Sequence, residues 1–428
     1  MRKTILTTAP LAALLLLSCA QKPSTQKPDI TYMPQPPFNP PTYVCYKAPA
    51  PIKIDGKLSP GEWDAIPWTS DFVDIEGDKR PAPHFQTRAK MTYDDNGMYF
   101  AVLMEEPHVW ATITEHDAVI FHDNDFEIFL NPTNDTHNYL EYEVNALGTE
   151  WDLFLTRPYR DNPQVLNNWE FAGMKSAVYV DGTLNNPKDT DKSWSVEVFI
   201  PWTSVFQMDR GKEKPEIGEQ IRVNFSRVEW TTDVKDGKYV KVPIQGEDKI
   251  REYNWVWAPT GVINIHMPEY WGYVQISDKI AGEGETPFVK HPSEETKWIL
   301  RNLYYRQNEF AATFGHYADN INDLKANELC PQEIANQLEI HTTPSMYEIS
   351  LPAPDGTVWN IRQDGLVWPK KKITQFINQL KYHEAKEFMD SGLGFRHHAI
   401  GSRTTKWWRH LTHDVAANQT VLSRNADR

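Results

Sequence analysis

The chain is poor in cysteine, in positive charge and in long apolar stretches. Its 428 residues include three cysteines, 44 lysines and arginines against 58 aspartates and glutamates, and 16 tryptophans. The cysteines show no Cys-x-x-Cys or Cys/His spacing, which excludes a disulfide-rich scaffold and a zinc ribbon. A formal net charge of −14 argues against nucleic-acid wrapping, because a phosphate backbone requires a basic face. The tryptophans suit either a β-rich core or a sugar-stacking surface.

The most apolar run lies at the N-terminus and is shorter than the roughly 20 residues that span a bilayer. It occupies residues 5–17 and runs into the letters LLSC, which end at Cys19. This pattern resembles the signal box of bacterial lipoproteins. The resemblance implies that residues 1–19 are a signal peptide and that Cys19 is lipidated and anchors the chain to the membrane. Ala20, in place of aspartate, implies an outer-membrane lipoprotein facing the periplasm or the surface. An ordinary signal peptide with a chance cysteine is the alternative.

Two flanking segments carry little apolar pattern. Residues 20–42 hold seven prolines and are predicted to form an extended tether. Residues 371–428 hold ten Lys and Arg against five Asp and Glu, and we predict a basic, poorly ordered tail. Between them, Cys45 and Cys330 could form a disulfide in an oxidising compartment, whereas two unpaired buried thiols is the simpler interpretation.

Short alternating segments fill residues 43–280. The predicted strands lie within residues 91–104, 125–130, 141–146, 193–200, 221–230 and 271–276. An Asp-Asn-Gly turn inside the first segment predicts a hairpin. Alternation places Glu127, Glu143 and Asn145 opposite the apolar residues of their strands, either in one polar groove or on a solvated outer face. Many short strands with regular turns indicate a mainly β fold, a two-sheet antiparallel β-sandwich.

Five short motifs follow one another in this region. They are IDGKLSPGEW at 54–63, YDDNGMYFA at 93–101, DNDFEIFL at 123–130, WSVEVFIPW at 194–202 and VNFSR at 223–227. The series resembles the carbohydrate-binding module family 9-like domains (CBM9-like) of Bacteroidetes-type lipoproteins. The resemblance implies a β-sandwich that binds an oligo- or polysaccharide without catalysis, a link to polysaccharide catabolism and, in some members, structural calcium.

The resemblance also implies site residues. Glu127 and Asn145 match residues of the family's sugar site, while Glu229 falls near a family acidic residue. The expected ligand-binding residues are Glu127, Glu143, Asn145, Glu229, Arg227, Phe121, Trp257 and Trp110, and the expected metal ligands, for Ca²⁺, are Asp123 and Asp125. Phe121 stands where the family has its first stacking tryptophan, and Glu143 stands where it has a sugar-contacting arginine. These departures predict a different ligand or a weakened site, because sugar rings stack on aromatic faces.

Other functions stay open at this point. Two carboxylates about 5 to 9.5 Å apart would support a glycoside hydrolase that uses the acidic cluster. A haem or redox module would need an axial pair such as Met104 with His108 or His122. A metal site is a further alternative, because Asp117, Asp123 and Asp125 lie near the scattered His108, His116, His122 and His137. The spacing matches no zinc motif, and such histidines are usually polar loop residues. The remaining alternative is a purely structural protein of the cell envelope.

Residues 290–370 are predicted to form a small α+β domain. Ser293 is a candidate N-cap, apolar residues then recur at helical spacing, and Gly315 is the predicted stop. The predicted strands lie at 346–350, 358–362 and 365–368, the first two joined by a Pro-Asp-Gly hairpin. This outline resembles the head of a type IV pilin-like protein, a resemblance of fold.

Overall fold

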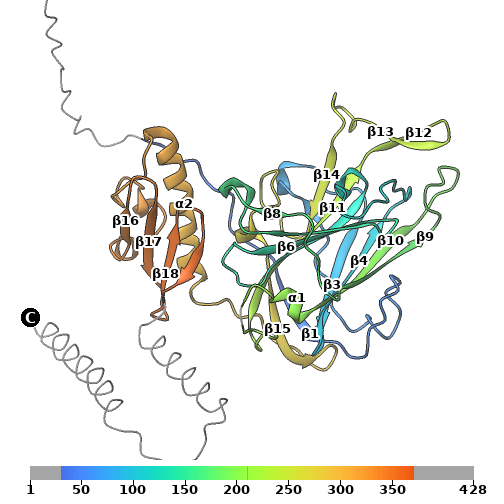
Figure 1. The fold of residues 1–428 in the computed structure, drawn as a ribbon, viewed down its shortest axis with the longest axis horizontal. Coiled ribbons are helices and arrows are strands. Elements are labelled where there is room, and N and C mark those ends of the chain that lie inside the picture. Colours follow the sequence, from blue (N-terminus) through green and yellow to red (C-terminus); the bar gives the residue numbers. More distant parts are fainter. Residues whose placement is uncertain (1–29, 210, 371–428) are drawn as a thin grey trace, which may run out of the picture. The chain divides into compact units, whose positions relative to one another are not determined.

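The described part of the chain is mainly β-structure (Figure 1). The computed structural model describes residues 30–209 and 211–370. The predicted signal peptide 1–19, its lipidation site Cys19 and the predicted tail 371–428 lie outside these described residues. Within them, no helix combines the length and the apolar character needed to cross a membrane.

One mixed sheet of 13 strands contains the predicted sandwich. Its strands are β1 (Thr42–Lys47), β2 (Val73–Asp74), β3 (Thr87–Tyr93), β4 (Gly97–Glu105), β5 (Asp125–Asn131), β6 (Tyr139–Asn145), β7 (Glu150–Leu155), β8 (Val165–Leu166), β9 (Lys175–Asp181), β10 (Ser193–Pro201), β11 (Gln220–Trp230), β14 (Glu252–Val256) and β15 (Gly272–Ile280). The main path runs β8-β7-β6-β5-β11-β15-β1-β3-β4-β10-β9, and β14 pairs with β11 and β2. A separate hairpin joins β12 (Thr232–Lys235) to β13 (Lys238–Lys241). A short helix, α1 (Trp202–Val205), follows β10.

The prediction of two purely antiparallel sheets was wrong at β1. This strand pairs in parallel with β15 on one side and with β3 on the other, so it joins the two halves into one sheet. The halves still face each other across an apolar core, where the rings of Phe100 on β4 and Phe225 on β11 lie 6.0 Å apart. Hairpins produce antiparallel neighbours, but β1 meets β15 from far along the chain, a pairing that no local pattern reveals.

The predicted hairpin at 91–104 is confirmed as β3 and β4. Asp94 closes the turn, since its Oδ1 accepts hydrogen bonds from the backbone N–H groups of Asn96 (2.7 Å) and Gly97 (3.1 Å). Glycine is required at position 97, because a Cβ there would lie 2.3 Å from the carbonyl oxygen of Ile200. The other predicted strands coincide with β5, β6, β10, β11 and β15.

The motif at 54–63 owes its shape to Glu197, a fully buried residue of β10. The Glu197 carboxylate accepts four hydrogen bonds of 2.8 to 3.1 Å, and their donors are the backbone N–H groups of Asp55, Gly56 and Leu58 and the indole N–H of Trp63. Charge-assisted bonds of this kind are stronger than neutral ones. The motifs at 54–63 and 194–202 are therefore two parts of one local structure.

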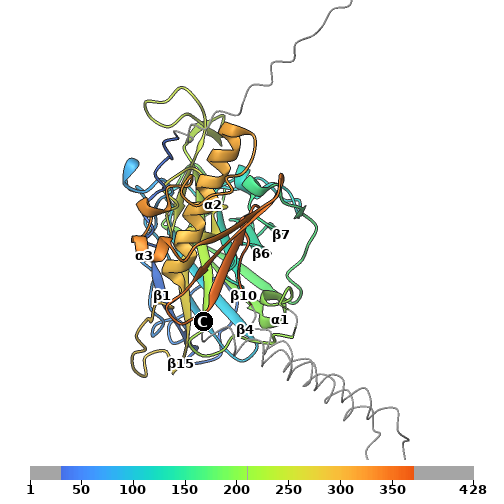
Figure 2. The same cartoon turned by 90° about the vertical axis from the view of Figure 1, so that its left-hand side faces the viewer.

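The C-terminal part has its own core. Helix α2 (Glu294–Phe314) packs on a four-stranded sheet of β16 (Glu339–Thr342), β17 (Tyr347–Pro352), β18 (Val358–Arg362) and β19 (Val367–Pro369), with the short α3 (Gln332–Ala335) nearby (Figure 2). The helix, its stop at Gly315 and three strands are confirmed, whereas β16 was not predicted. Ser293 precedes the helix but does not cap it, because its hydroxyl bonds to Asp355 instead.

Residues 30–41, in the segment predicted as a tether, lie against this C-terminal part. Ile30 and Tyr32 are buried in its core, and the ring of Phe38 stacks on Trp298 of α2 with centroids 4.0 Å apart. Cys45 and Cys330 are both free and buried, as the simpler interpretation predicts.

Candidate functional site

A cavity of about 270 Å³ lies over β5, β6 and β7. Four glutamates and four ring-bearing residues contribute to its wall: Glu127, Glu141, Glu143, Glu252, Phe121, Trp151, Tyr159 and His266. Asn254 of β14 and the segment 263–265 complete one side. The cavity therefore combines carboxyl groups with aromatic rings, the two kinds of group that recognise sugars.

Strand register brings the acidic residues together. Glu127 of β5 lies directly opposite Glu143 of β6, and Glu143 lies opposite Trp151 of β7. Directly opposed residues have Cβ atoms about 4.5–5.5 Å apart and point to the same face. The prediction that Glu127 and Glu143 share a face is confirmed. Both are buried, 6% and 2% exposed, so this face is not an ordinary solvated outer surface.

Burial dominates the electrostatics of this cluster. It raises the pKa of Glu127 to about 7 and the pKa values of Asp125, Glu141 and Glu143 well above the usual range of carboxyl groups. Neighbouring carboxylates raise these pKa values further, and the described residues place no lysine or arginine among the main causes of the four shifts. A cluster of this kind holds protons near neutral pH, so its members can both donate and accept hydrogen bonds.

Three buried polar atoms of this region have no hydrogen-bond partner among the described residues. They are the indole Nε1 of Trp151, Oε2 of Glu141 and Oδ2 of Asp125. More than nine in ten buried polar groups in proteins are paired, so each exception requires an explanation. Trp151 and Glu141 line the cavity, so a polar ligand there that supplies one acceptor and one donor would satisfy their two atoms, whereas Asp125 lies outside its lining.

Arg227 and Glu229 were predicted as ligand-binding residues, but their polar groups are engaged within the protein. Arg227 is fully buried and forms ion pairs with Glu106 (2.9 Å) and Glu229 (2.8 Å). It also donates to Thr87 and to the carbonyl of Glu105. Neither residue lines the cavity, because β11 directs Ser226 and Val228 to that side and Arg227 and Glu229 to the other.

Asn145 and Asp123 are likewise engaged in local structure. Asp123 accepts from the N–H groups of Thr112 and Ile113, from the Thr112 hydroxyl and from Asn145 Nδ2. Asn145 also holds the turn after β6 by accepting from two backbone N–H groups. The oxygens of Asp123 are thus occupied, and its donor set does not fit calcium, which needs six to eight free oxygen ligands. Asp125, in contrast, keeps one oxygen free beside Glu127 and Glu143.

The predicted aromatic residues divide between cavity and core. Phe121 lines the cavity. Trp257 is 3% exposed and packs in the main core against Phe225 and Tyr43. Trp110 is 6% exposed and belongs to a small cluster with Trp230 that Phe121 also contacts, so it supports the cavity wall from behind.

Sequence reasoning missed several residues of the cavity. Glu141 carried a usable signal, since it alternates in phase with Glu143 along one strand. Trp151 belongs to β7, a strand whose pattern was not recognised, and Tyr159 and His266 come from turns whose positions depend on tertiary structure. His266 is held by a hydrogen bond to the Tyr139 hydroxyl (2.9 Å), and burial lowers its pKa to about 3.

Among curated proteins no sequence matches this chain. The crystal structure of a protein described as "a putative carbohydrate-binding protein" from Bacteroides uniformis aligns at 16% identity and a TM-score of 0.42. The alignment covers 56% of this chain and 100% of that chain. A carbohydrate binding module family 9 from Caldicellulosiruptor kristjanssonii, solved with glucose and with cellotriose, aligns at 15% identity, with TM-scores of 0.35 and 0.34, over 57% of this chain and 98% of that one.

Residues 54–240 match the family described as carbohydrate family 9 binding domain-like. This range contains β2 to β12 and most of β13, hence Glu127, Glu141, Glu143 and Trp151, but it ends before β14 and the segment 263–266. The pilin-like resemblance of the C-terminal part stays a prediction. The chain therefore carries a CBM9-like domain, matched from residue 54 to residue 240.

Proposed function

We propose that the CBM9-like domain binds carbohydrate, without catalysis, in the cavity over β5, β6 and β7. The observation that carries this proposal is a pair of unpaired polar atoms on residues that line the cavity, Trp151 Nε1 and Glu141 Oε2. Sugar hydroxyls donate and accept at once, so one ring can satisfy both. The match of residues 54–240 to a carbohydrate-binding family supports the same conclusion.

The size and chemistry of the cavity favour a small ligand. A volume of about 270 Å³ lies just below the usual range for ligand pockets, about 300–1,000 Å³. We infer a terminal or short saccharide, with its apolar face on Trp151 or Phe121 and its hydroxyls on Glu127, Glu141 and Glu143. Phe121 offers a smaller face than tryptophan, which predicts a weaker stacking contribution than a two-tryptophan clamp would give.

The carboxyl cluster fits binding better than hydrolysis. A glycosidase needs one carboxyl group held protonated and a second held ionised. Here burial moves the pKa values of Asp125, Glu127, Glu141 and Glu143 in the same direction, upward. These four groups therefore supply hydrogen-bonding groups, and their common upward shift does not mark one as an acid and another as a nucleophile.

The setting of this binding is also a proposal. The lipoprotein-like box at Cys19 supports attachment to the outer membrane, with the domain facing the periplasm or the surface. A non-catalytic sugar-binding domain in that place would capture poly- or oligosaccharide for catabolism. Metabolic labelling with a fatty acid, lost on Cys19→Ser, tests the anchor separately from the sugar site.

A glycan array with the purified full-length chain tests the binding function. We expect at least one glycan to be bound, with about a tenfold weaker affinity for Trp151→Ala, equivalent to roughly 1.4 kcal/mol, and a similar loss for Glu127→Gln. Glu283→Gln, an exposed glutamate outside the cavity, is the matched control. Absence of binding at millimolar glycan, or equal binding by all variants, contradicts the proposal, and release of reducing sugar would assign hydrolysis instead.

A further inference from the structure

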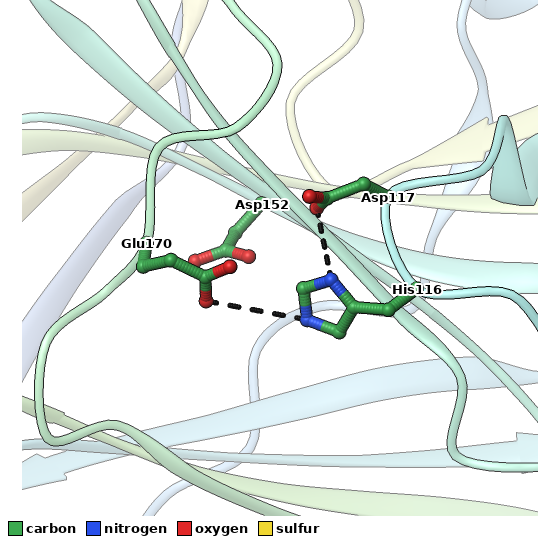
Figure 3. Close-up of side chains that lie close together, drawn as sticks. All are labelled: His116, Asp117, Asp152 and Glu170. Carbon is green, nitrogen blue, oxygen red and sulfur yellow. Dashed lines mark ion pairs between the residues drawn. The ribbon is translucent and has the colours of Figure 1, made fainter.

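A second cluster of metal-ligating side chains lies outside the cavity. His116, Asp117, Asp152 and Glu170 each offer one ligand atom, and these atoms all lie within 4.8 Å of one another (Figure 3). They come from three segments, namely the loop before β5, strand β7 and the loop after β8. Asp152 follows Trp151 on β7, so the two side chains point to opposite faces and the cluster is separate from the cavity.

Asp152 is the buried member of the cluster, and one of its carboxylate oxygens is unpaired. Its side chain is 1% exposed, yet its Oδ1 has no hydrogen-bond partner among the described residues. Figure 3 shows this carboxyl group directed toward His116 and Glu170. A buried carboxylate oxygen left unpaired is costly, and a bound cation removes that cost.

The described residues place three carboxylates and a single basic side chain in the cluster. His116 lies 3.1 Å from Asp117 and 4.0 Å from Glu170, and in residues 30–209 and 211–370 these contacts are the ion pairs that the four side chains make. The formal charge is −3 with a neutral imidazole and −2 with a protonated one. Among the main influences that the described residues exert on the pKa of Asp152, none comes from a lysine or arginine.

Two of the three segments are already fixed in place. The Phe171 N–H, next to Glu170, donates to Asp152 Oδ2 (2.6 Å), and the Asp117 N–H donates to the Glu150 carbonyl of β7 (3.1 Å). Binding would thus require small rotations of His116 and Glu170, which are both exposed. Such preorganisation lowers the entropic cost of assembling a site.

We propose that His116, Asp117, Asp152 and Glu170 form a binding site for one divalent transition-metal ion of the zinc type. One imidazole and three carboxylates give four donors, the number that a tetrahedral zinc site needs, and zinc binds such nitrogen and oxygen donors at about 2.0–2.2 Å. Calcium prefers six to eight oxygens, and imidazole suits zinc, copper, iron or nickel. The ion would fasten the loops at 116–117 and 170 to β7. This site does not depend on the proposed sugar binding.

Calorimetry with the metal-stripped, untagged full-length chain tests the proposal. We expect one equivalent of Zn²⁺ to bind, the melting temperature to rise by several degrees at saturating metal, and Ca²⁺ and Mg²⁺ to bind at least tenfold more weakly. His116→Ala and Glu170→Gln, both at exposed positions that the fold tolerates, should each weaken Zn²⁺ binding at least tenfold. Asp152→Asn should weaken it most, provided that its unfolding curve stays cooperative.

The controls are neighbouring residues that do not belong to the cluster. His122→Ala removes an exposed imidazole, and Glu115→Gln removes an exposed carboxylate of the same loop. Both controls should bind Zn²⁺ like the unaltered chain. The proposal is overturned by absence of Zn²⁺ binding at 1 mM (roughly 4 kcal/mol in affinity), by equal losses in controls and cluster variants, or by Ca²⁺ binding that exceeds Zn²⁺ binding and survives His116→Ala.

Discussion

Buried glutamates occur in two regions of this molecule, with opposite electrostatics. Glu269 and Glu294 lie where strands of the large sheet meet helix α2, and cations hold their pKa values near 2 against the effect of burial. Glu127, Glu141 and Glu143 are buried to a similar extent in the cavity, but their pKa values rise. The difference comes from the partners: Arg160 pairs with Glu269, and Lys297 and Arg222 pair with Glu294, whereas no described lysine or arginine lines the cavity.

The two regions differ in whether buried charge is compensated by an ion pair within the protein. A buried ion pair is compensated within the protein, so removing one partner leaves the other uncompensated. A buried carboxyl group without a cation is tolerated by taking up a proton, at the expense of stability at higher pH. Substitutions in the two regions should therefore shift the free energy of unfolding in opposite directions.

The largest effect is expected from breaking the compensated pair. Arg160 holds both oxygens of Glu269, at 2.9 and 3.0 Å. Arg160→Leu should lower the free energy of unfolding by about 3–5 kcal/mol, because it leaves the buried Glu269 without its main partner. Urea denaturation followed by tryptophan fluorescence measures this change.

Arg251→Leu is the matched control for that substitution. Arg251 also binds both oxygens of a glutamate, Glu247, but about a third of each side chain is exposed. Removing an exposed pair costs about 0–1 kcal/mol. Equal losses for the two variants would contradict the view that burial gives the Arg160 pair its importance.

A stabilisation is expected from neutralising the cavity. Glu127 has its pKa raised from 4.5 to about 7, so its ionised form opposes folding at pH 8 by about 3 kcal/mol at most. Glu127→Gln keeps the shape without the charge and should raise the free energy of unfolding at pH 8 by one or a few kcal/mol. The same variant should bind the glycan ligand more weakly. Destabilisation by Glu127→Gln at pH 8 would show that its charge is compensated after all.

The sequence predicted that acidic residues share one face of the sheet. It did not predict which buried charges are compensated by ion pairs. Alternation along two strands placed Glu127 and Glu143 together, and hairpin signals located β3 and β4, because both depend on local periodicity. The prediction that Arg227 meets a ligand came from a strand motif, yet its partners Glu106 and Glu229 are set by packing. Likewise, no local pattern distinguishes a core tryptophan such as Trp257 from an exposed one.

The two regions also predict an unusual pH dependence. Raised pKa values in the cavity make stability fall as pH rises from about 4.5 to about 7, since the folded state binds more protons there. Lowered pKa values of Glu269 and Glu294 make stability fall as pH drops from about 4.5 toward 2. Melting temperatures across pH 3 to 8 should therefore peak near pH 5, and in Glu127→Gln the decline above pH 5 should be shallower. A peak at pH 7 or above would contradict the assignment.

The smallest effect on stability is expected at Trp151, where stability and glycan affinity should respond differently to one substitution. Its indole N–H has no partner among the described residues, and the side chain is half-buried beside Glu143. Trp151→Phe keeps an aromatic face and removes a donor that the free protein does not use, so the free energy of unfolding should change by less than about 1 kcal/mol. If the donor serves a sugar hydroxyl, calorimetry should show glycan affinity falling about five- to tenfold, the loss of one hydrogen bond of about 1 kcal/mol.

Trp257→Phe, in the core, should do the reverse: it should lower the free energy of unfolding by more than 1 kcal/mol and leave affinity unchanged. A Trp151→Phe variant that loses stability but keeps affinity would place Trp151 with the structural residues and leave the cavity without its donor.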